Sequence, residues 1–173
     1  MSPKTPDAAQ RYSVRQPTRD ELNRALADSE LSLDRAFIDA ALERGDICSS
    51  AFDGDRLIAY GWRTLATAPH LDGLWVRCSK PYCYGYNAFT HPDYRGKHLS
   101  TGMTRMLDVY AAEQGFTHHI AFMSPDNYAS VASMRHRDGR RIGWAGYFKL
   151  FGKVYPFHSP GTRKHTFRFY VEP

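Results

Sequence analysis

The chain has 173 residues, of which 42% are hydrophobic and 14% aromatic, and its formal net charge is +5. This length predicts one domain with a sizeable core, and the composition excludes a disordered chain. No run of about 18 apolar residues occurs, so no membrane span is expected. The positive balance favours an anionic partner, such as a nucleotide phosphate, nucleic acid or anionic lipid, without choosing among them.

The first segment, "MSPKTPDAAQ", lacks the apolar stretch of a secretory signal, and a flexible leader is expected over residues 1–11. The three cysteines, Cys48, Cys78 and Cys83, have no metal-type spacing and cannot all pair with one another. A reducing, cytoplasmic location without a bound metal is therefore expected.

The first half of the chain predicts a strand, two helices and a hairpin. "YSVRQ", from Tyr12, alternates weakly and is expected to form a strand. Thr18 has the position of a helix N-cap, with Glu21 at capping-box spacing. The next helix covers "SLDRAFIDAALERG" and ends at Gly45. Two strand-like runs flank Asp53-Gly54-Asp55 and predict a β-hairpin, whereas "HLDGLWV" is interpreted as a loop.

The second half predicts further strands and two helices. "KPYCYGYNAFT" alternates strongly and places Tyr82, Tyr84 and Tyr86 on one side of a strand. A helix follows from Leu99, then the strand "THHIAFMS" and the short helix "NYASVASMRHR". "RRIGWAGYFKLFGKVY" and "KHTFRFYVEP" are interpreted as aromatic strands of the core, joined by the loop "PFHSPGTR". This order predicts one mixed α/β (α+β) domain over residues 12–173, with a mostly antiparallel twisted sheet flanked by about four helices.

The segment "FTHPDYRGKHLS" joins a strand to an amphipathic helix through a basic loop. The first turn of a helix carries unpaired N–H groups and the positive end of the helix dipole. Arg95 and Lys97 stand beside that turn, so the sequence predicts a seat for a phosphate or pyrophosphate. The nucleotide-hydrolase loop and the dinucleotide fingerprint are both absent.

Two segments resemble the coenzyme-binding motifs of the GNAT superfamily of N-acyltransferases. "FTHPDYRGKHLS" resembles the loop that holds the pyrophosphate of coenzyme A, and "NYASVASMRHRDGRRIG" resembles the helix along its pantetheine arm. The resemblance implies a GNAT-like fold and acetyl-CoA, or another acyl-CoA, as co-substrate. The coenzyme-binding residues that it implies are Phe89, Thr90, Arg95, Gly96, Lys97, His98, Leu99, Ser100, Thr101, Asn127 and Ser130.

The chain departs from the family pattern at several positions. His98 stands where the family usually has glycine, and Ser100 where it has glycine or alanine. We expect His98 to keep an allowed backbone and to turn its ring outward. Met134 replaces a tyrosine that many members use as an acid. Asp138-Gly139 stands where a glycine–aromatic pair often ends the helix.

The resemblance implies direct attack of an amine on the acyl thioester in a ternary complex. The strand before the loop contains no Asp, Glu or His that could act as base. Tyr84 is the candidate, either directly or by holding a relay water; the alternative is that these tyrosines only pack as aromatics. Ser133 is the candidate acid, with Ser130 expected to hydrogen-bond the pantetheine. The pair His118–His119 is interpreted as structural, with a catalytic role left open.

The acceptor is expected to be a small-molecule or peptide amine contacted by the loop "VYPFHSPGTR". The cationic run at 135–141 either forms a solvated helix end or grips phosphates. Two alternatives stay open: an acyl-CoA-binding module without turnover, and acetyl transfer to an RNA-borne amine. A dedicated RNA-binding domain is disfavoured because the aromatics alternate as core residues do. A homodimer is also left open.

Overall fold

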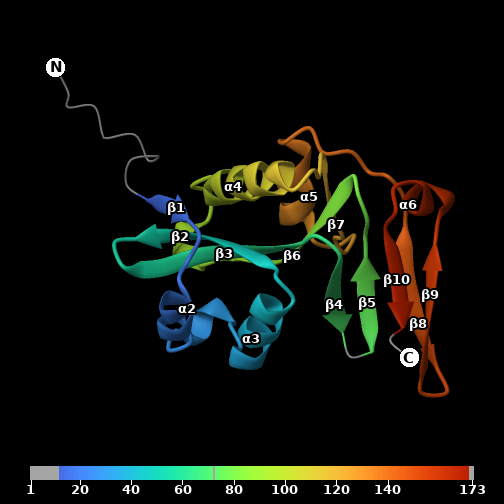
Figure 1. The fold of residues 1–173 in the computed structure, drawn as a ribbon, viewed down its shortest axis with the longest axis horizontal. Helices are drawn as coiled ribbons and strands as arrows, with labels where there is room; N and C mark the ends of the chain where they lie inside the picture. Colours follow the sequence, from blue (N-terminus) through green and yellow to red (C-terminus); the bar gives the residue numbers. More distant parts are fainter. Residues whose placement is uncertain (1–11, 72, 172–173) are drawn as a thin grey trace. The chain divides into compact units, whose positions relative to one another are not determined.

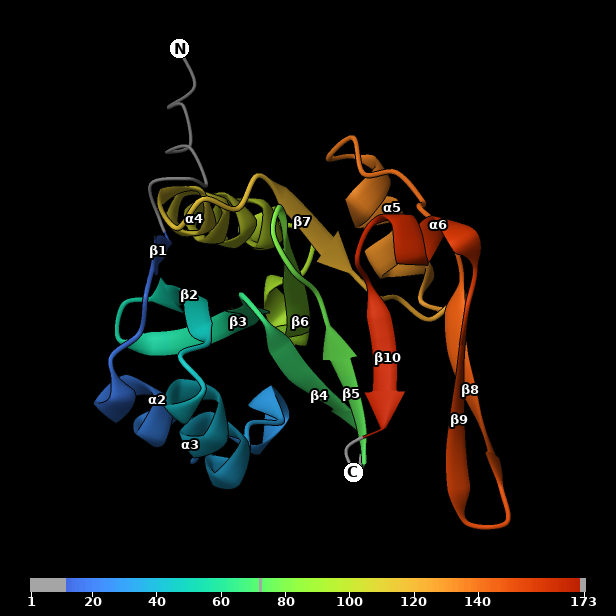
Figure 2. The same cartoon turned by 45° about the vertical axis from the view of Figure 1, so that its right-hand side comes forward.

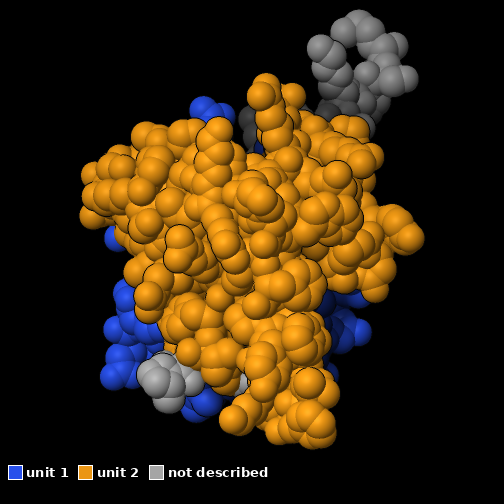
Figure 3. Space-filling model, turned by 90° about the vertical axis from the view of Figure 1, so that its right-hand side faces the viewer, with its two compact units in different colours: residues 1–63, 87–110 blue, residues 64–86, 111–173 orange. Residues whose placement is uncertain are grey.

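A computed structural model of the protein describes residues 12–71 and 73–171 (Figure 1). The predicted leader over residues 1–11 lies outside the described residues. The chain divides into two compact units, which Figure 3 colours blue and orange. Unit 1 consists of residues 1–63 and 87–110, and unit 2 of residues 64–86 and 111–173. The predicted single domain over 12–173 stays a prediction.

Unit 1 is a small sheet with helices on both of its faces (Figures 1 and 2). Its antiparallel strands β1, β2 and β3 are followed in hydrogen-bonding order by β6 (Tyr82–Thr90), whose last four residues belong to this unit. Helices α2 and α3 lie on one face and α4 on the other. The elements are β1 Ser13–Arg15, α2 Arg19–Ala25, η1 Ser29–Leu31, α3 Arg35–Glu43, β2 Ile47–Asp53, β3 Arg56–Thr64, η2 Pro92–Tyr94 and α4 Leu99–Glu113, the last of which ends in unit 2.

The capping box predicted for the first helix is confirmed. Thr18 accepts from the backbone N–H of Glu21, and the Glu21 carboxylate accepts from the backbone N–H of Thr18. Hydrogen bonds from Arg15 and then from Thr18 lower the pKa of Glu21 to about 2. The Asp53–Asp55 hairpin is also confirmed, with the turn at Gly54 and Asp55.

Unit 2 is built from shorter strands around one aromatic core. Strand β6 pairs with β7 in parallel, β5 lies between β4 and β10 in an antiparallel sheet, and β8 and β9 form a hairpin. The core contains Ala68, Leu74, Val76, Cys78, Tyr84, Ile120, Phe167 and Phe169. The elements are β4 Thr67–Leu71, β5 Leu74–Arg77, β6 Tyr82–Thr90, β7 His118–Ala121, α5 Tyr128–Arg135, β8 Ala145–Leu150, β9 Lys153–His158, α6 Pro160–Lys164 and β10 Arg168–Val171.

The mixed α/β class with mostly antiparallel pairing is confirmed, but three details predicted for unit 2 are wrong. "HLDGLWV" is not a loop, because it contains the end of β4 and most of β5. The run up to Tyr155 is not one strand, because the chain reverses at Phe151 and Gly152, which have φ of +50° and +74°. "PFHSPGTR" is not a loop, because it contains the end of β9 and most of α6.

Candidate coenzyme A site

The turn that follows β6 is anchored inside unit 1. The backbone N–H of His91 donates to the carbonyl of Ile58 at 2.9 Å, and the buried His91 ring contacts Glu30. Two residues on, the N–H of Asp93 donates to His91 Nδ1 at 3.3 Å. The Tyr94 hydroxyl donates to Asp53 at 3.0 Å. These contacts fix the start of the basic loop against the sheet.

A run of backbone donors follows this turn. Among the described residues, no acceptor takes the N–H groups of the five consecutive residues Gly96, Lys97, His98, Leu99 and Ser100. The N–H of Thr101 differs, because it donates to the His98 carbonyl at 3.0 Å. Consecutive free amides at the start of a long helix are a physical match for a pyrophosphate.

Side chains around these amides leave the seat open and basic. Leu99 is buried against Ala51, Ile58 and Met103, so only its backbone can face a ligand. Arg95 is exposed and bonds the Thr90 carbonyl at 3.3 Å through Nε, which leaves its terminal nitrogens for an anion. Lys97 lies over the Tyr94 ring, with Nζ 4.5 Å from the centroid.

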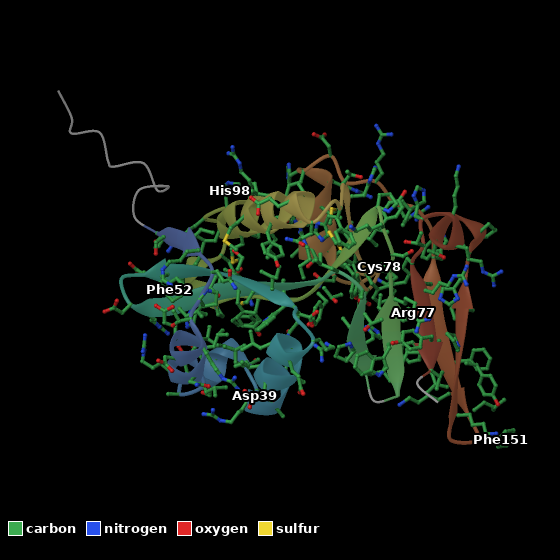
Figure 4. The ribbon with its side chains drawn as sticks, in the orientation of Figure 1. Asp39, Phe52, Arg77, Cys78, His98 and Phe151 are labelled. Atoms are coloured by element: carbon green, nitrogen blue, oxygen red, sulfur yellow. The ribbon has the colours of Figure 1, made fainter. Side chains whose placement is uncertain are left out.

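His98 adopts a backbone conformation that favours glycine. Its φ is +56°, in the left-handed region, and its side chain is exposed (Figure 4). The expected outward ring is thus what the structure shows. The expected coenzyme role of the five amides, and of Phe89, Thr90 and Thr101 beside them, stays a prediction. Phe89 itself stacks on Tyr60, with ring centroids 5.9 Å apart.

Helix α5 carries the second group of predicted coenzyme residues, in unit 2. Asn127 caps this helix, because its side-chain oxygen accepts from the N–H of Ser130 at 3.1 Å. Ser133 lies one turn further on and is half-buried. The helix ends with Asp138 at φ +57° and with the N–H of Gly139 donating to the Met134 carbonyl at 3.0 Å, a Schellman-type closure.

Tyr84, the candidate base, lies within the aromatic core of unit 2. Its ring stacks on Tyr86 and contacts Phe167, with centroids 5.9 and 5.8 Å away. Burial, followed by the nearby Cys78 thiol, raises the pKa of Tyr84 well above its usual value near 10. This environment disfavours Tyr84 as a direct base at neutral pH; its role in holding a relay water stays a prediction.

The histidine pair on β7 is split between two environments. The His118 ring pairs with the Thr117 hydroxyl at 2.8 Å and is exposed. The His119 ring lies against Gly85, where a Cβ would stand 2.3 Å from Nε2. Glycine at this position of β6 is therefore what lets the ring approach the strand.

Sequence reasoning missed Asn87. This residue has φ of +43° inside β6, two residues after the last pair of the β6–β7 ladder at Gly85. Asparagine tolerates the left-handed region better than most residues, and it stands inside an otherwise aromatic strand. An asparagine inside a strand with many aromatic residues was therefore the sequence feature that could have predicted the irregular backbone of β6 at this position.

Strand, basic amide-rich loop and helix N-terminus together form an arrangement suited to an anionic group such as a phosphate. A family model described as acetyltransferase (GNAT) family matches residues 12–137, which is most of the chain. The chain therefore belongs to the GNAT acetyltransferase family. A sequence search against curated proteins finds no significant match.

Solved structures share this fold. AAC(6′)-Iy in complex with the bisubstrate analogue CoA-S-monomethyl-acetylneamine aligns with TM-score 0.62 and 14% identity, over 80% of this chain and 97% of that one. A complex of AAC(6′)-Iy with CoA gives 0.64 and 14%, over 81% and 95%. The aminoglycoside 6′-N-acetyltransferase AAC(6′)-Ih from Acinetobacter baumannii gives 0.62 and 17%, over 80% and 97%. At these identities the similarity shows the fold.

Family membership makes the protein an acyl-CoA-dependent N-acyltransferase, with acyl-CoA as its co-substrate. The open amides between β6 and α4 fit the pyrophosphate of that coenzyme. Within residues 12–71 and 73–171, no group of three His, Cys, Asp or Glu side chains could hold a metal ion. No helix in the same ranges is both long and apolar enough to cross a membrane.

Proposed function

We propose that the protein moves an acetyl group, or a closely related acyl group, from acyl-CoA to a primary amine by direct attack. The observation that carries this proposal is the run of five unaccepted amides from Gly96 to Ser100 beside Arg95. Such amides bind a pyrophosphate without needing a glycine at every position, so the departure at His98 does not remove the seat.

In this reaction the amine nitrogen forms a bond to the thioester carbon, and the carbon–sulfur bond breaks. An ordinary alkylammonium has a pKa near 10 and must first lose a proton. Tyr84 stays protonated in its buried position and cannot accept that proton at neutral pH. The proton therefore leaves to water, and the thiolate departs by its own modest basicity or with a proton from Ser133.

The positive charge of this chain near the predicted acceptor loop limits which kinds of amine it can accept. The structural neighbours with aminoglycoside names act on polycations. In this chain the segment that contains the predicted acceptor loop is strongly basic, with nine Lys or Arg and one Asp between Arg135 and Arg168. Like charges across a binding surface cost several kcal/mol. We therefore propose a small amine that is neutral or anionic apart from its amino group, with a nucleic-acid-borne amine as the second candidate.

The test is thiol release from acetyl-CoA over a panel of amines, beside a thermal shift with coenzyme A. The panel contains an aminoglycoside, spermidine, a neutral amino acid ester, an amino-sugar phosphate and an aminoacylated RNA. Turnover that is faster with the neutral or phosphorylated amines than with the polycations is expected. Turnover restricted to the aminoglycoside would refute the acceptor class, and a coenzyme shift without any turnover would instead support a binding module.

A further inference from the structure

The β8–β9 hairpin of unit 2 presents an aromatic surface to solvent. Phe148, Leu150, Tyr155 and Phe157 are exposed by 52, 48, 40 and 52%. Phe151, at the turn, is exposed by 92% and stands at the far end of the hairpin in Figure 4. We call these five residues the outer face. The expectation that the aromatics of this segment are core is therefore wrong for this face.

The outer face is a product of the strand register. Phe148 is opposite Tyr155, and the two rings stack with centroids 5.2 Å apart and planes 14° apart. Phe157 is opposite Gly146, and its ring occupies the space that a Cβ would need, 2.4 Å away. Tyr147 and Val154 alternate onto the other side and pack against the core. The hairpin thus has one face in the core and one row of rings without cover.

The segment that carries the outer face also contains cations without a carboxylate partner among the described residues. Unit 1 pairs its cations with carboxylates, for example Arg44 with Asp46 and Arg63 with Asp108. With Arg137 left aside, no carboxylate among the described residues pairs with the cations of the segment from Arg135 to Arg168, which are Arg135, Arg140, Arg141, Lys149, Lys153, Arg163, Lys164 and Arg168.

Two further features of unit 2 place a cation over an aromatic ring or opposite another cation in the strand register. The Arg141 guanidinium lies 4.7 Å from the centroid of Trp144, which is 56% exposed. Arg168 on β10 stands directly opposite Arg77 on β5. Like charges in cross-strand register are unfavourable unless an anion comes between or beside them.

We propose that the outer face, together with cations of the segment from Arg135 to Arg168, binds single-stranded nucleic acid. Exposed rings are platforms on which bases stack, and unpaired Lys and Arg take the phosphates. A second copy of the chain is disfavoured, since it would bring two such cationic segments together. An anionic bilayer would use the turn with Leu150 and Phe151. It would leave the stacked pair and Phe157, which extend along strands of about 20 Å, without a partner. The inference is independent of acyl transfer.

The experiment measures binding of a fluorescent oligouridylate, about 20 nucleotides long, by anisotropy at several salt concentrations. The full chain is expected to bind it, with log Kd depending linearly on log salt. Phe148→Ser combined with Phe151→Ser should weaken binding at least tenfold and leave the salt slope unchanged. Lys153→Glu, on the outer face opposite Leu150, should lower the slope by about 0.7, which corresponds to one phosphate contact.

Matched controls come from unit 1. Val109→Ser removes an equally exposed apolar side chain, and Arg35→Glu reverses an exposed cation; each should change Kd less than twofold. An unchanged coenzyme-induced thermal shift shows that each variant is folded. The proposal is overturned if oligouridylate does not bind at about 50 mM salt, or if the Phe148/Phe151 variant binds like the parent. Phe-dependent binding to phosphatidylglycerol vesicles without RNA binding, or Phe-dependent dimerisation in sedimentation equilibrium, would overturn it too.

Discussion

His98 and Asp138 are non-glycine residues in a backbone conformation that favours glycine. Both have left-handed φ, of +56° and +57°, and both are exposed. Only glycine visits this region without a steric cost, and for other residues the cost is about 1–2 kcal/mol. His98 carries this strain at the centre of the open amides, so its substitution separates backbone from side-chain effects.

His98→Gly is expected to keep or improve the affinity for coenzyme A and to raise stability by up to about 1 kcal/mol, since the relieved strain exceeds the added entropy of the unfolded chain. Urea unfolding and coenzyme titration measure the two effects. Ser32→Gly is the control, because Ser32 also has positive φ, +51°, but lies at the end of η1. A tenfold loss of affinity, about 1.4 kcal/mol, would show that the imidazole contacts the ligand.

Tyr84 leads to a second residue-level prediction, on pH. Without a titrating base near neutrality, kcat/KM should rise with pH to at least the high eights as the acceptor amine becomes neutral. Tyr84→Phe should slow turnover roughly ten- to a hundredfold if the hydroxyl holds the relay water, and should leave the coenzyme shift unchanged.

The measurement is the pH dependence of steady-state kinetics for the parent and for Tyr84→Phe, from neutral pH to the high eights. The highest pH at which these kinetics can be measured is set by the stability of the folded protein. Burial raises the pKa of Tyr84, so the stabilising contribution of its protonated form is lost as pH rises above the unfolded value near 10. A plateau near pH 7 together with a fully active Tyr84→Phe would contradict the prediction and direct attention to His118 and His119.

At the level of elements, the sequence predicted correctly those caps, turns and helices that local residue chemistry determines. The capping box at Thr18, the Asp53–Asp55 turn and the amphipathic helix from Leu99 depend on near neighbours, and each appears in place. β4 was missed because Pro69 argues against a strand; it is tolerated because β4 is the edge of its sheet. The reversal at Phe151 was missed because a bulky residue with positive φ contradicts local preference.

In the candidate site, too, features that depend on near neighbours could be predicted, and features that depend on the folded context could not. The positions of the basic loop and of the short helix that starts near Asn127 were readable, because spacing and residue type specify them. Dihedral angles at His98 and Asn87 were not, because they depend on how the strand and helix are held. The burial of Tyr84 likewise depends on Phe167 and Phe169, which lie more than 80 residues later in the chain.

Arg168 gives a prediction for an element pair. Because Arg168 is opposite Arg77, Arg168→Glu should replace a repulsive cross-strand pair by an attractive one and stabilise the protein by about 0.5 kcal/mol. Lys153→Glu makes the same change in net charge opposite Leu150, so the difference between the two variants in urea unfolding isolates the pair. Equal stabilities of the two variants would show that the cross-strand pair contributes nothing.

Across the whole molecule, charge is divided unevenly. Unit 2 holds eleven Lys or Arg and five Asp or Glu, while unit 1 holds twelve and thirteen. The open amides, in contrast, lie in the unit without excess charge. We therefore expect coenzyme binding to depend on the local donors and on Arg95, rather than on the net charge of the molecule.

Coenzyme A is expected to raise the melting temperature, because a ligand that binds only the folded state stabilises it by about 2.7 kcal/mol at a hundred times its Kd. For a chain of this length that corresponds to about 5–10 °C. Arg95→Glu should abolish the shift by placing a carboxylate beside the pyrophosphate. Arg35→Glu changes the net charge equally but lies at the start of α3, so it should preserve the shift.

If the shift depends on local donors, differential scanning fluorimetry will show a coenzyme-induced shift for Arg35→Glu and none for Arg95→Glu. If both lose it equally, net charge governs binding, and if Arg95→Glu shifts like the parent, the pyrophosphate does not lie at this loop.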